Sequence, residues 1–265
     1  MSSPHDLDTV PNISTPTLWH ITISPYSEKV RWALAYKGVS YQRRAPVPGA
    51  HMAVALWLTR GRSYTFPILQ WDGRCYQDST AIIAALEDGH QSPSLYPDDP
   101  GERARALELE DFFDEQVGPY VRRFVFHELI RDPQQFETVM SKAAPGLGMG
   151  PTGVRAARGM LGLRYDAHRE AAAADARTRV LAGLDKLESE LGDADYLAGG
   201  RFSVADLTAA ALFYPLVLPP EATVVLDGMP EPVERLRAEL RERRGYRWVE
   251  QMFRWHRRPI AAAAG

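Results

Sequence analysis

Cysteine is almost absent from this 265-residue chain, in which Cys75 is the only one. A single cysteine excludes an internal disulfide framework and any metal site built from several thiolates. Lysine is scarce as well, since four lysines accompany 27 arginines, and the net charge is −3. A weakly acidic chain has no overall field that would attract nucleic acid or anionic membranes. We therefore expect small-molecule or protein partners.

Long apolar runs are also missing. The longest, at residues 207–218, is too short to span a bilayer and is followed by Pro219 and Pro220. Residues 1–16 contain no apolar core of the signal-peptide type, and we predict a disordered tail there. These absences predict a cytoplasmic protein with no membrane partner.

The first half of the chain alternates between strand and helix patterns. Apolar residues recur at every second position over 17–23, as in a half-buried strand. From Tyr26 to Leu34 the spacing changes to the stripe of a helix with one buried face, and Gly38 supplies a stop. Further expected elements are a short strand at 40–44, a hairpin at 66–77 around an Asp-Gly turn, and a helix over 78–88.

The second half has helical patterns only. Residues 91–102 have the Pro, Ser and Asp content of a linker, and Ser203 with Asp206 forms a capping-box signature with a structural role. Residues 131–176 are less clear, and their glycine-rich part lacks the GK[ST] of a phosphate loop, which favours a flexible connection. Helices are expected within 104–130, 177–191, 202–214 and 247–256. We predict an α/β domain over 17–90, a linker over 91–103 and an all-helical domain over 104–260.

Four short motifs follow one another in a specific order. They are S-P-Y-S at 24–27, F-P-I-L at 66–69, D-S-T at 78–80 and F-S-V-A-D at 202–206. In this order the chain resembles the cytosolic glutathione S-transferase superfamily over roughly residues 17–258. The resemblance implies a two-domain α+β fold, in which an N-terminal thioredoxin-like domain binds the thiol and an all-α domain follows.

Ser24 is the predicted catalytic residue. Residues 24 and 27 stand where thioredoxin-like proteins carry C-x-x-C, and both are serine, which excludes dithiol chemistry. The loop is similar to that of the serine-type tau, zeta and omega transferases, in which a hydroxyl donates a hydrogen bond to the glutathione sulfur. A free thiol has a pKa of about 8.5, so a donor at a helix N-terminus would favour the thiolate. Ser24 also suits a helix cap, and Ser27 is the alternative active hydroxyl.

The resemblance also implies a binding site for the rest of glutathione. Pro67 matches a cis-proline that turns the backbone of Phe66 toward the cysteinyl part, although an ordinary trans-proline would fit an edge strand. Asp78 and Ser79 open a helix, and together they suit the charged γ-glutamyl end. They also suit a simple cap. Relatives usually carry Glu before this serine, so Asp78 is one methylene shorter.

A pocket for the second substrate is expected between the domains. Tyr120, Arg123, Phe124 and His127 share one face of the predicted helix, where they would either hold an apolar electrophile or form core. Tyr26 is a further candidate, although its place on the apolar stripe favours packing.

The resulting hypothesis is a glutathione S-transferase-like enzyme, without a metal, that attacks a small and largely apolar electrophile. The resemblance implies a homodimer and a role in detoxification. Two alternatives stay open: a non-catalytic glutathione-binding or protein-interaction module, and a transferase that uses a different low-molecular-weight thiol. The arginines after residue 234 alternate with glutamates, so they indicate a solvated helix face rather than a nucleic-acid site. Cys75 is expected to be a small buried filler.

Overall fold

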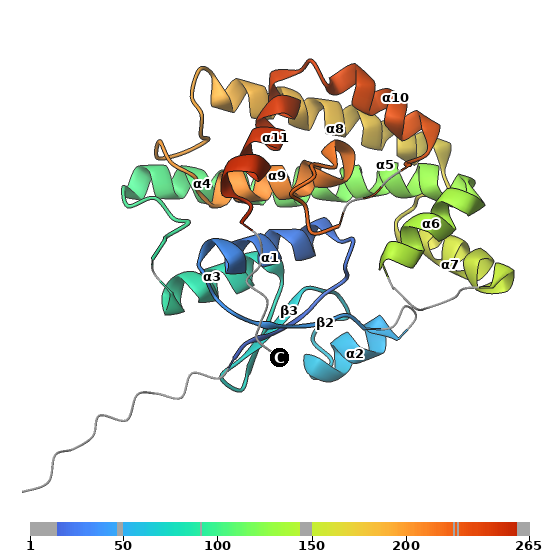
Figure 1. Cartoon of the computed structure of the whole chain (residues 1–265), viewed down its shortest axis with the longest axis horizontal. Helices are drawn as coiled ribbons and strands as arrows, with labels where there is room; N and C mark the ends of the chain where they lie inside the picture. Colours follow the sequence, from blue (N-terminus) through green and yellow to red (C-terminus); the bar gives the residue numbers. More distant parts are fainter. Residues whose placement is uncertain are drawn as a thin grey trace, which may run out of the picture.

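A small sheet with helices on both of its faces is stacked against a larger bundle of helices (Figure 1). The computed structural model describes residues 15–46, 50–90, 92–143, 150–224, 226 and 228–258. The predicted order, a thioredoxin-like domain followed by an all-helical domain, is confirmed. The predicted N-terminal tail lies outside the described residues except for Thr15 and Pro16.

The sheet within the described ranges has the order β2-β1-β3-β4. β1 pairs in parallel with β2, while β3 is antiparallel to both β1 and β4. The predicted hairpin is confirmed, whereas the strand expected over 17–23 ends at Trp19 because the chain turns toward the next helix. The strands are β1 (Thr17–Trp19), β2 (Gln42–Arg44), β3 (Ile68–Trp71) and β4 (Arg74–Gln77).

Helices α1 (Pro25–Tyr36) and α3 (Ser79–Gly89) cover one face of the sheet, and α2 (His51–Leu58) covers the other (Figure 1). Alternate residues of β3 point to opposite faces. Leu69 belongs to the large core with α1 and α3, while Ile68 belongs to a small cluster with Ala55 and Leu58 of α2. α2 was not predicted, because its sequence is apolar on almost every side and lacks a helical period.

The helical domain divides the stretch expected over 104–130 into two helices, since the chain breaks at Val117 before Gly118 and Pro119. The described part of residues 131–176, which the sequence pattern left undefined, contains two further helices and the start of a third. The helices are α4 (Pro100–Gln116), α5 (Gly118–Arg131), α6 (Pro133–Ala143), α7 (Pro151–Arg164), α8 (Glu170–Leu191), α9 (Val204–Val217), α10 (Glu231–Leu240) and α11 (Arg244–His256). Most of the glycine-rich connection lies outside the described residues.

Helix α9 is the centre of this domain, and every one of its residues is buried. Its start is fixed by the predicted capping box, in which the Asp206 carboxylate accepts from the Ser203 N–H at 2.9 Å. The same carboxylate accepts from the Leu197 N–H at 2.8 Å. In the ranges that the structure describes, each helix is too short or too polar to traverse a bilayer.

The two domains are joined through a buried carboxylate of α1. The Glu28 side chain contacts Arg31 of the same helix at 2.7 Å and Arg257, beyond α11, at 2.7 Å. All three side chains are nearly inaccessible to solvent. Arg257 also donates to the Thr223 hydroxyl at 2.7 Å, so the C-terminal end of the helical domain is anchored on α1.

Replacing Glu28 by Gln keeps the shape of the side chain but leaves two buried guanidinium groups without their carboxylate. We expect the free energy of unfolding at pH 7 to fall by about 3 kcal/mol, as when one partner of a buried pair is removed. Urea denaturation followed by circular dichroism measures this change. Glu115→Gln, at an exposed position of α4, is the matched control, with an expected change below about 0.5 kcal/mol.

The stability difference between the wild type and Glu28→Gln should depend on pH. Burial alone would raise the pKa of Glu28, but Arg31 and Arg257 outweigh it and hold the pKa at about 2. The unfolded value is about 4.3, so this stabilisation is complete above about pH 4.5 and is lost between about pH 4.5 and pH 2. The stability difference between the wild type and Glu28→Gln should shrink across this window. A difference that stays constant would contradict the ion cluster.

Candidate functional site

The pairing of the strands brings three separate segments to one end of the sheet. Ile68, at the start of β3, pairs with Trp19 at the end of β1 and with Gln77 at the end of β4. The residues that follow β1, precede β3 and follow β4 therefore meet at this end. They are the predicted Ser24, Phe66, Pro67, Asp78 and Ser79, which we name the sheet-end site.

Ser24 is the N-cap of α1, and its Oγ accepts from the Ser27 N–H at 3.4 Å. The side chain is half-buried, and no described residue accepts a hydrogen bond from its hydroxyl. Ser27 is fully buried, and its Oγ accepts from the Ile21 N–H at 3.3 Å. Of the two serines, Ser24 is thus the more exposed one, while Ser27 Oγ holds the turn between β1 and α1.

The bond between Phe66 and Pro67 is cis, as the resemblance implies. The Phe66 ring lies in the cluster under α2, so the side chain is anchored away from solvent. Next to it, Gln77 Nε2 donates to Thr65 Oγ1 at 3.3 Å, which ties the segment before β3 to the end of β4. This contact sets Phe66 and Pro67 beside the start of α3.

Asp78 caps α3 rather than standing free. Its backbone has a φ of 83°, in the left-handed region, and its Oδ1 accepts from the Thr80 N–H at 2.9 Å. Ser79 differs, because its side chain is 1% exposed and its Oγ has no partner among the described residues. Buried hydroxyls without a hydrogen bond are uncommon. Ser79 Oγ is thus a buried polar atom without a partner among the described residues, and it lies at the N-terminus of α3, where anions are favoured.

A buried ion cluster holds the start of α3 in place. Lys29 Nζ lies 2.8 Å from Glu110 and 2.9 Å from Asp114, both on α4, and donates to Thr80 Oγ1 at 3.2 Å. Burial alone would lower the pKa of Lys29, but the two carboxylates outweigh it and raise the pKa above its usual value. The cluster fixes the neighbour of Ser79 against both α1 and α4.

The predicted second-substrate residues on α5 occupy different environments. Phe124 and His127 are buried, and His127 Nδ1 lies 2.7 Å from the Ala167 carbonyl oxygen. Arg123 Nε donates to the Tyr165 carbonyl at 2.9 Å, and its guanidinium lies 5.5 Å from the half-buried Tyr120 ring. These contacts place the four side chains among the helices of the second domain, and their role as a pocket remains a prediction.

Tyr26 lies next to a part of α5, Arg122 and Phe126, that was not predicted from the sequence. Its hydroxyl donates to the Asp114 carbonyl at 2.9 Å, and burial is the main cause that raises its pKa. The Arg122 guanidinium lies 5.6 Å from the Tyr26 ring and 4.4 Å from the Tyr165 ring, and its buried Nε has no partner among the described residues. Phe126, one turn further, stacks on Tyr165. The i, i+4 spacing of Arg122 and Phe126 was the available signal.

Two family descriptions match the chain. "Glutathione S-transferase, N-terminal domain" covers residues 18–94, and "Glutathione S-transferase, C-terminal domain" covers residues 170–250. Together they account for more than half of the sequence, and the first of them includes all five residues of the sheet-end site.

Among similar proteins, some are named as glutathione S-transferases and one is named for its localization with FtsZ. FtsZ-localized protein A of Caulobacter vibrioides is 28% identical over 205 residues, which are 74% of each chain. A probable glutathione S-transferase of Nicotiana tabacum is 31% identical over 102 residues, or 38% of this chain. This match spans 45% of the tobacco protein, less than half of its length.

Solved structures share the fold at low sequence identity. A glutathione S-transferase of Ceriporiopsis subvermispora in complex with glutathione has a TM-score of 0.62 at 17% identity, covering 94% of this chain and 100% of the other. FzlA from C. crescentus has a TM-score of 0.57 at 24% identity, with coverages of 95% and 97%.

Replacing Lys29 by Met tests the ion cluster behind the site. The change leaves Glu110 and Asp114 without their cation, and we expect the free energy of unfolding at neutral pH to fall by about 3 to 5 kcal/mol. Lys186→Met, in an exposed pair with Glu190, should cost less than about 1 kcal/mol. Urea denaturation measures both variants.

Acid should partly rescue Lys29→Met. Without Lys29, burial raises the pKa of Glu110 further above its unfolded value, so the penalty is largest at high pH and falls as the carboxyl is protonated. The loss relative to the wild type should be smaller near pH 5 than near pH 8. An equal loss at both pH values would show that packing, rather than charge, explains the defect.

Proposed function

The chain belongs to the glutathione S-transferase superfamily, and on this premise we propose that it is a glutathione-binding protein-interaction module. The observation that carries the binding half is the buried Ser79 hydroxyl, which lacks a partner among the described residues at the start of α3. A carboxylate of the γ-glutamyl group would complete its hydrogen bonding next to the helix N-terminus. Phe66, beside the cis-proline, would meet the cysteinyl backbone, and Ser24 the sulfur.

The interaction half is supported by the extent of the similarities. The relative named FtsZ-localized protein A matches 74% of this chain, whereas the relatives named as transferases or as an isomerase match 31% to 44%. A similarity that runs through both domains carries more weight for the role of the whole chain than one limited to a part. The name concerns where that protein is found, so the partner of this chain is left open.

Transferase chemistry is the second candidate, and the geometry of Ser24 favours it. Its hydroxyl proton is free of protein acceptors in the described ranges, and its Oγ lies at the N-terminus of α1. A donated hydrogen bond and the helix dipole both stabilise a thiolate. The thiolate would attack an electrophilic carbon, form a C–S bond and expel the leaving group with its electron pair, while the thiol proton passes to solvent.

Asp78 bears on the identity of the thiol. Its carboxylate is engaged with the Thr80 N–H, so the ammonium group of a γ-glutamyl ligand would share an acceptor that already caps α3. A different low-molecular-weight thiol, without that ammonium group, would not need the Asp78 carboxylate as a hydrogen-bond acceptor. Glutathione and a thiol of this second kind should therefore be compared in the same binding experiment.

Ser79→Ala tests the binding site. We expect calorimetry to detect glutathione binding to the wild type, and the variant to bind at least about tenfold more weakly because a charge-assisted hydrogen bond is lost. Ser141→Ala, an exposed serine of α6, should bind like the wild type. Absence of binding in the wild type would overturn the glutathione assignment. Equal affinity in Ser79→Ala would remove Ser79 from the site.

Ser24→Ala separates the module from the enzyme. The module predicts glutathione binding with no conjugation of a generic aryl halide by the wild type. If conjugation occurs, the transferase predicts that kcat/KM falls in Ser24→Ala. The midpoint of its pH profile should then move upward, toward the pKa of a free thiol at about 8.5. Turnover in the wild type that Ser24→Ala leaves unchanged would contradict the role of Ser24.

A further inference from the structure

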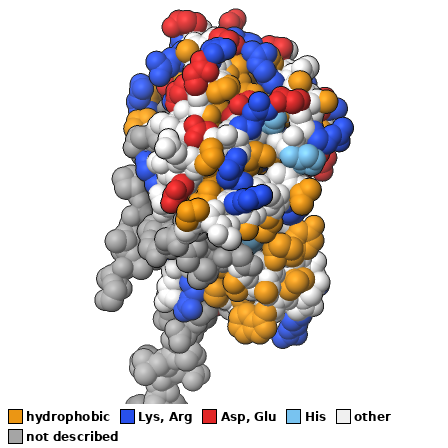
Figure 2. All heavy atoms as spheres, turned by 90° about the vertical axis from the view of Figure 1, so that its right-hand side faces the viewer, with side chains coloured by type: hydrophobic (Ala, Val, Ile, Leu, Met, Phe, Trp, Pro, Cys, Tyr) orange, Lys and Arg blue, Asp and Glu red, His pale blue; other side chains and the backbone are white. Residues whose placement is uncertain are grey.

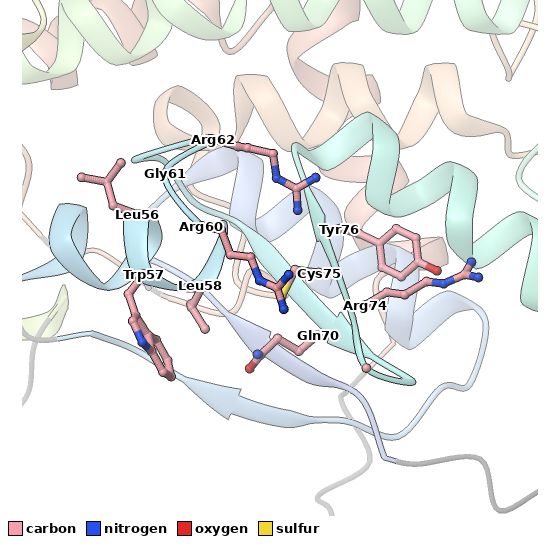
Figure 3. Close-up of a pocket in the computed structure, with 11 residues that line it drawn as sticks. Leu56, Trp57, Leu58, Arg60, Gly61, Arg62, Gln70, Arg74, Cys75 and Tyr76 are labelled. Carbon is pink, nitrogen blue, oxygen red and sulfur yellow. The ribbon is translucent and has the colours of Figure 1, made fainter.

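One hollow in the described part of the chain lies away from the sheet-end site. It has a volume of about 930 Å³ and opens on the α2 face of the sheet, between the end of α2 and the β3–β4 hairpin (Figure 3). Gln70 and Cys75, which pair across β3 and β4, form its floor. We name it the arginine groove after the three basic residues among its lining: Arg60, Arg62 and Arg74.

All three arginines are exposed, and none has a carboxylate partner among the described residues. Arg62 donates to the Thr59 carbonyl at 3.0 Å, while the side chains of Arg60 and Arg74 contact no acidic group in the described ranges. Some exposed arginines elsewhere are paired with a carboxylate, as Arg177 is with Glu239 at 3.0 Å. Since the whole chain is acidic, three arginines without an acidic partner in the described ranges form a local site for negative charge around this hollow.

The backbone conformation of Arg60 is also unusual. Arg60 ends the turn after α2 with a φ of 54°, in the left-handed region that favours glycine, and Gly61 follows with a φ of 81°. An arginine at this position carries a small conformational cost. The turn directs Arg60 toward Gln70 and Cys75 (Figure 3).

Beside the arginines, α2 exposes large apolar side chains. Trp57 is 74% exposed and Leu56 is 41% exposed, and both line the groove. Met52, one turn before Leu56, is 39% exposed and extends the apolar surface along α2. Figure 2 shows apolar side chains gathered in the lower part of this view, where α2 lies. An exposed tryptophan next to unpaired cations is typical of a protein-binding surface.

The third wall of the groove is the edge of the sheet. Within the described residues β4 pairs only with β3, and the consecutive residues Arg74, Cys75 and Tyr76 all line the hollow. Neighbouring side chains of a strand point to opposite faces, so the groove follows the outer edge of β4. An edge strand offers backbone N–H and C=O groups to an extended segment.

We propose that the arginine groove binds a short, extended, acidic segment of a partner protein. The segment lies along β4, its carboxylates meet Arg60, Arg62 and Arg74, and an apolar side chain packs on Trp57. This inference rests on the interaction half of the proposed function and is independent of glutathione binding. Nucleic acid fits less well, because the chain is acidic overall and the groove presents apolar side chains and a strand edge.

The probe is a fluorescein-labelled peptide of about twelve residues that alternates glutamate with leucine and carries one phenylalanine. We expect it to bind in fluorescence anisotropy, and Arg60→Glu, Arg74→Glu and Trp57→Ala each to weaken it at least about tenfold. Arg254→Glu and Trp255→Ala, exposed on α11, are the matched controls and should change the affinity less than about twofold. The groove residues are exposed, so the variants should fold.

Cys75 supplies a second readout, because it is the only cysteine of the chain and lies in the groove. Saturating peptide should slow its reaction with a maleimide at least about tenfold, while a peptide with lysine in place of glutamate should not protect it. The proposal is overturned by no peptide binding, by equal binding of the lysine peptide, by tighter binding of a single-stranded oligonucleotide, or by groove variants that bind like the wild type. Glutathione calorimetry on the same variants should be unchanged, so either half can fail alone.

Discussion

The position of α1 depends on the buried carboxylate of Glu28. Its two guanidinium partners come from α1 itself and from the segment after α11, so one charge cluster closes the interface between the domains. Such a cluster forms only when the geometry is complete, because a lone buried charge is costly. Ser24 lies one turn before Glu28, and its hydroxyl is therefore held at a fixed place relative to both domains.

Lys29, the next residue, makes the corresponding contact on another side of the helix. It binds two carboxylates of α4 and the hydroxyl of Thr80 at the start of α3. Two adjacent residues of opposite charge thus fix α1 against both ends of the helical domain and against α3. These contacts position the segments that carry the sheet-end site, in which Ser24 Oγ and Asp78 Oδ1 accept from the backbone N–H groups of Ser27 and Thr80.

The sequence predicted those features that depend on local pattern. The apolar stripe from Tyr26 defined α1, and the Asp-Gly turn defined the hairpin. The ordered motifs also predicted one site from Ser24, Pro67 and Ser79, and the strand pairing brings the segments that carry them to one end of the sheet. Glu28 and Lys29 were not recognised, because polar residues off the apolar stripe look solvated until partners more than 80 positions away are known. Helix α2 was not predicted because its almost entirely apolar sequence shows no alternation of apolar and polar residues at helical spacing.

The α5 residues show the same limit of prediction from sequence patterns. Helical spacing identifies residues that share a face, yet it does not say which face turns toward Tyr26. Arg122 was found only from its contacts with the Tyr26 and Tyr165 rings. The arginine groove depends still more on tertiary structure, because residues 56–62 and 70–76 meet only after α2 packs on the sheet. Ala55 and Leu58 of α2 belong to the cluster around Phe66, whereas Leu56 and Trp57 of the same helix line the groove. The two sites therefore share one helix while opening on different surfaces.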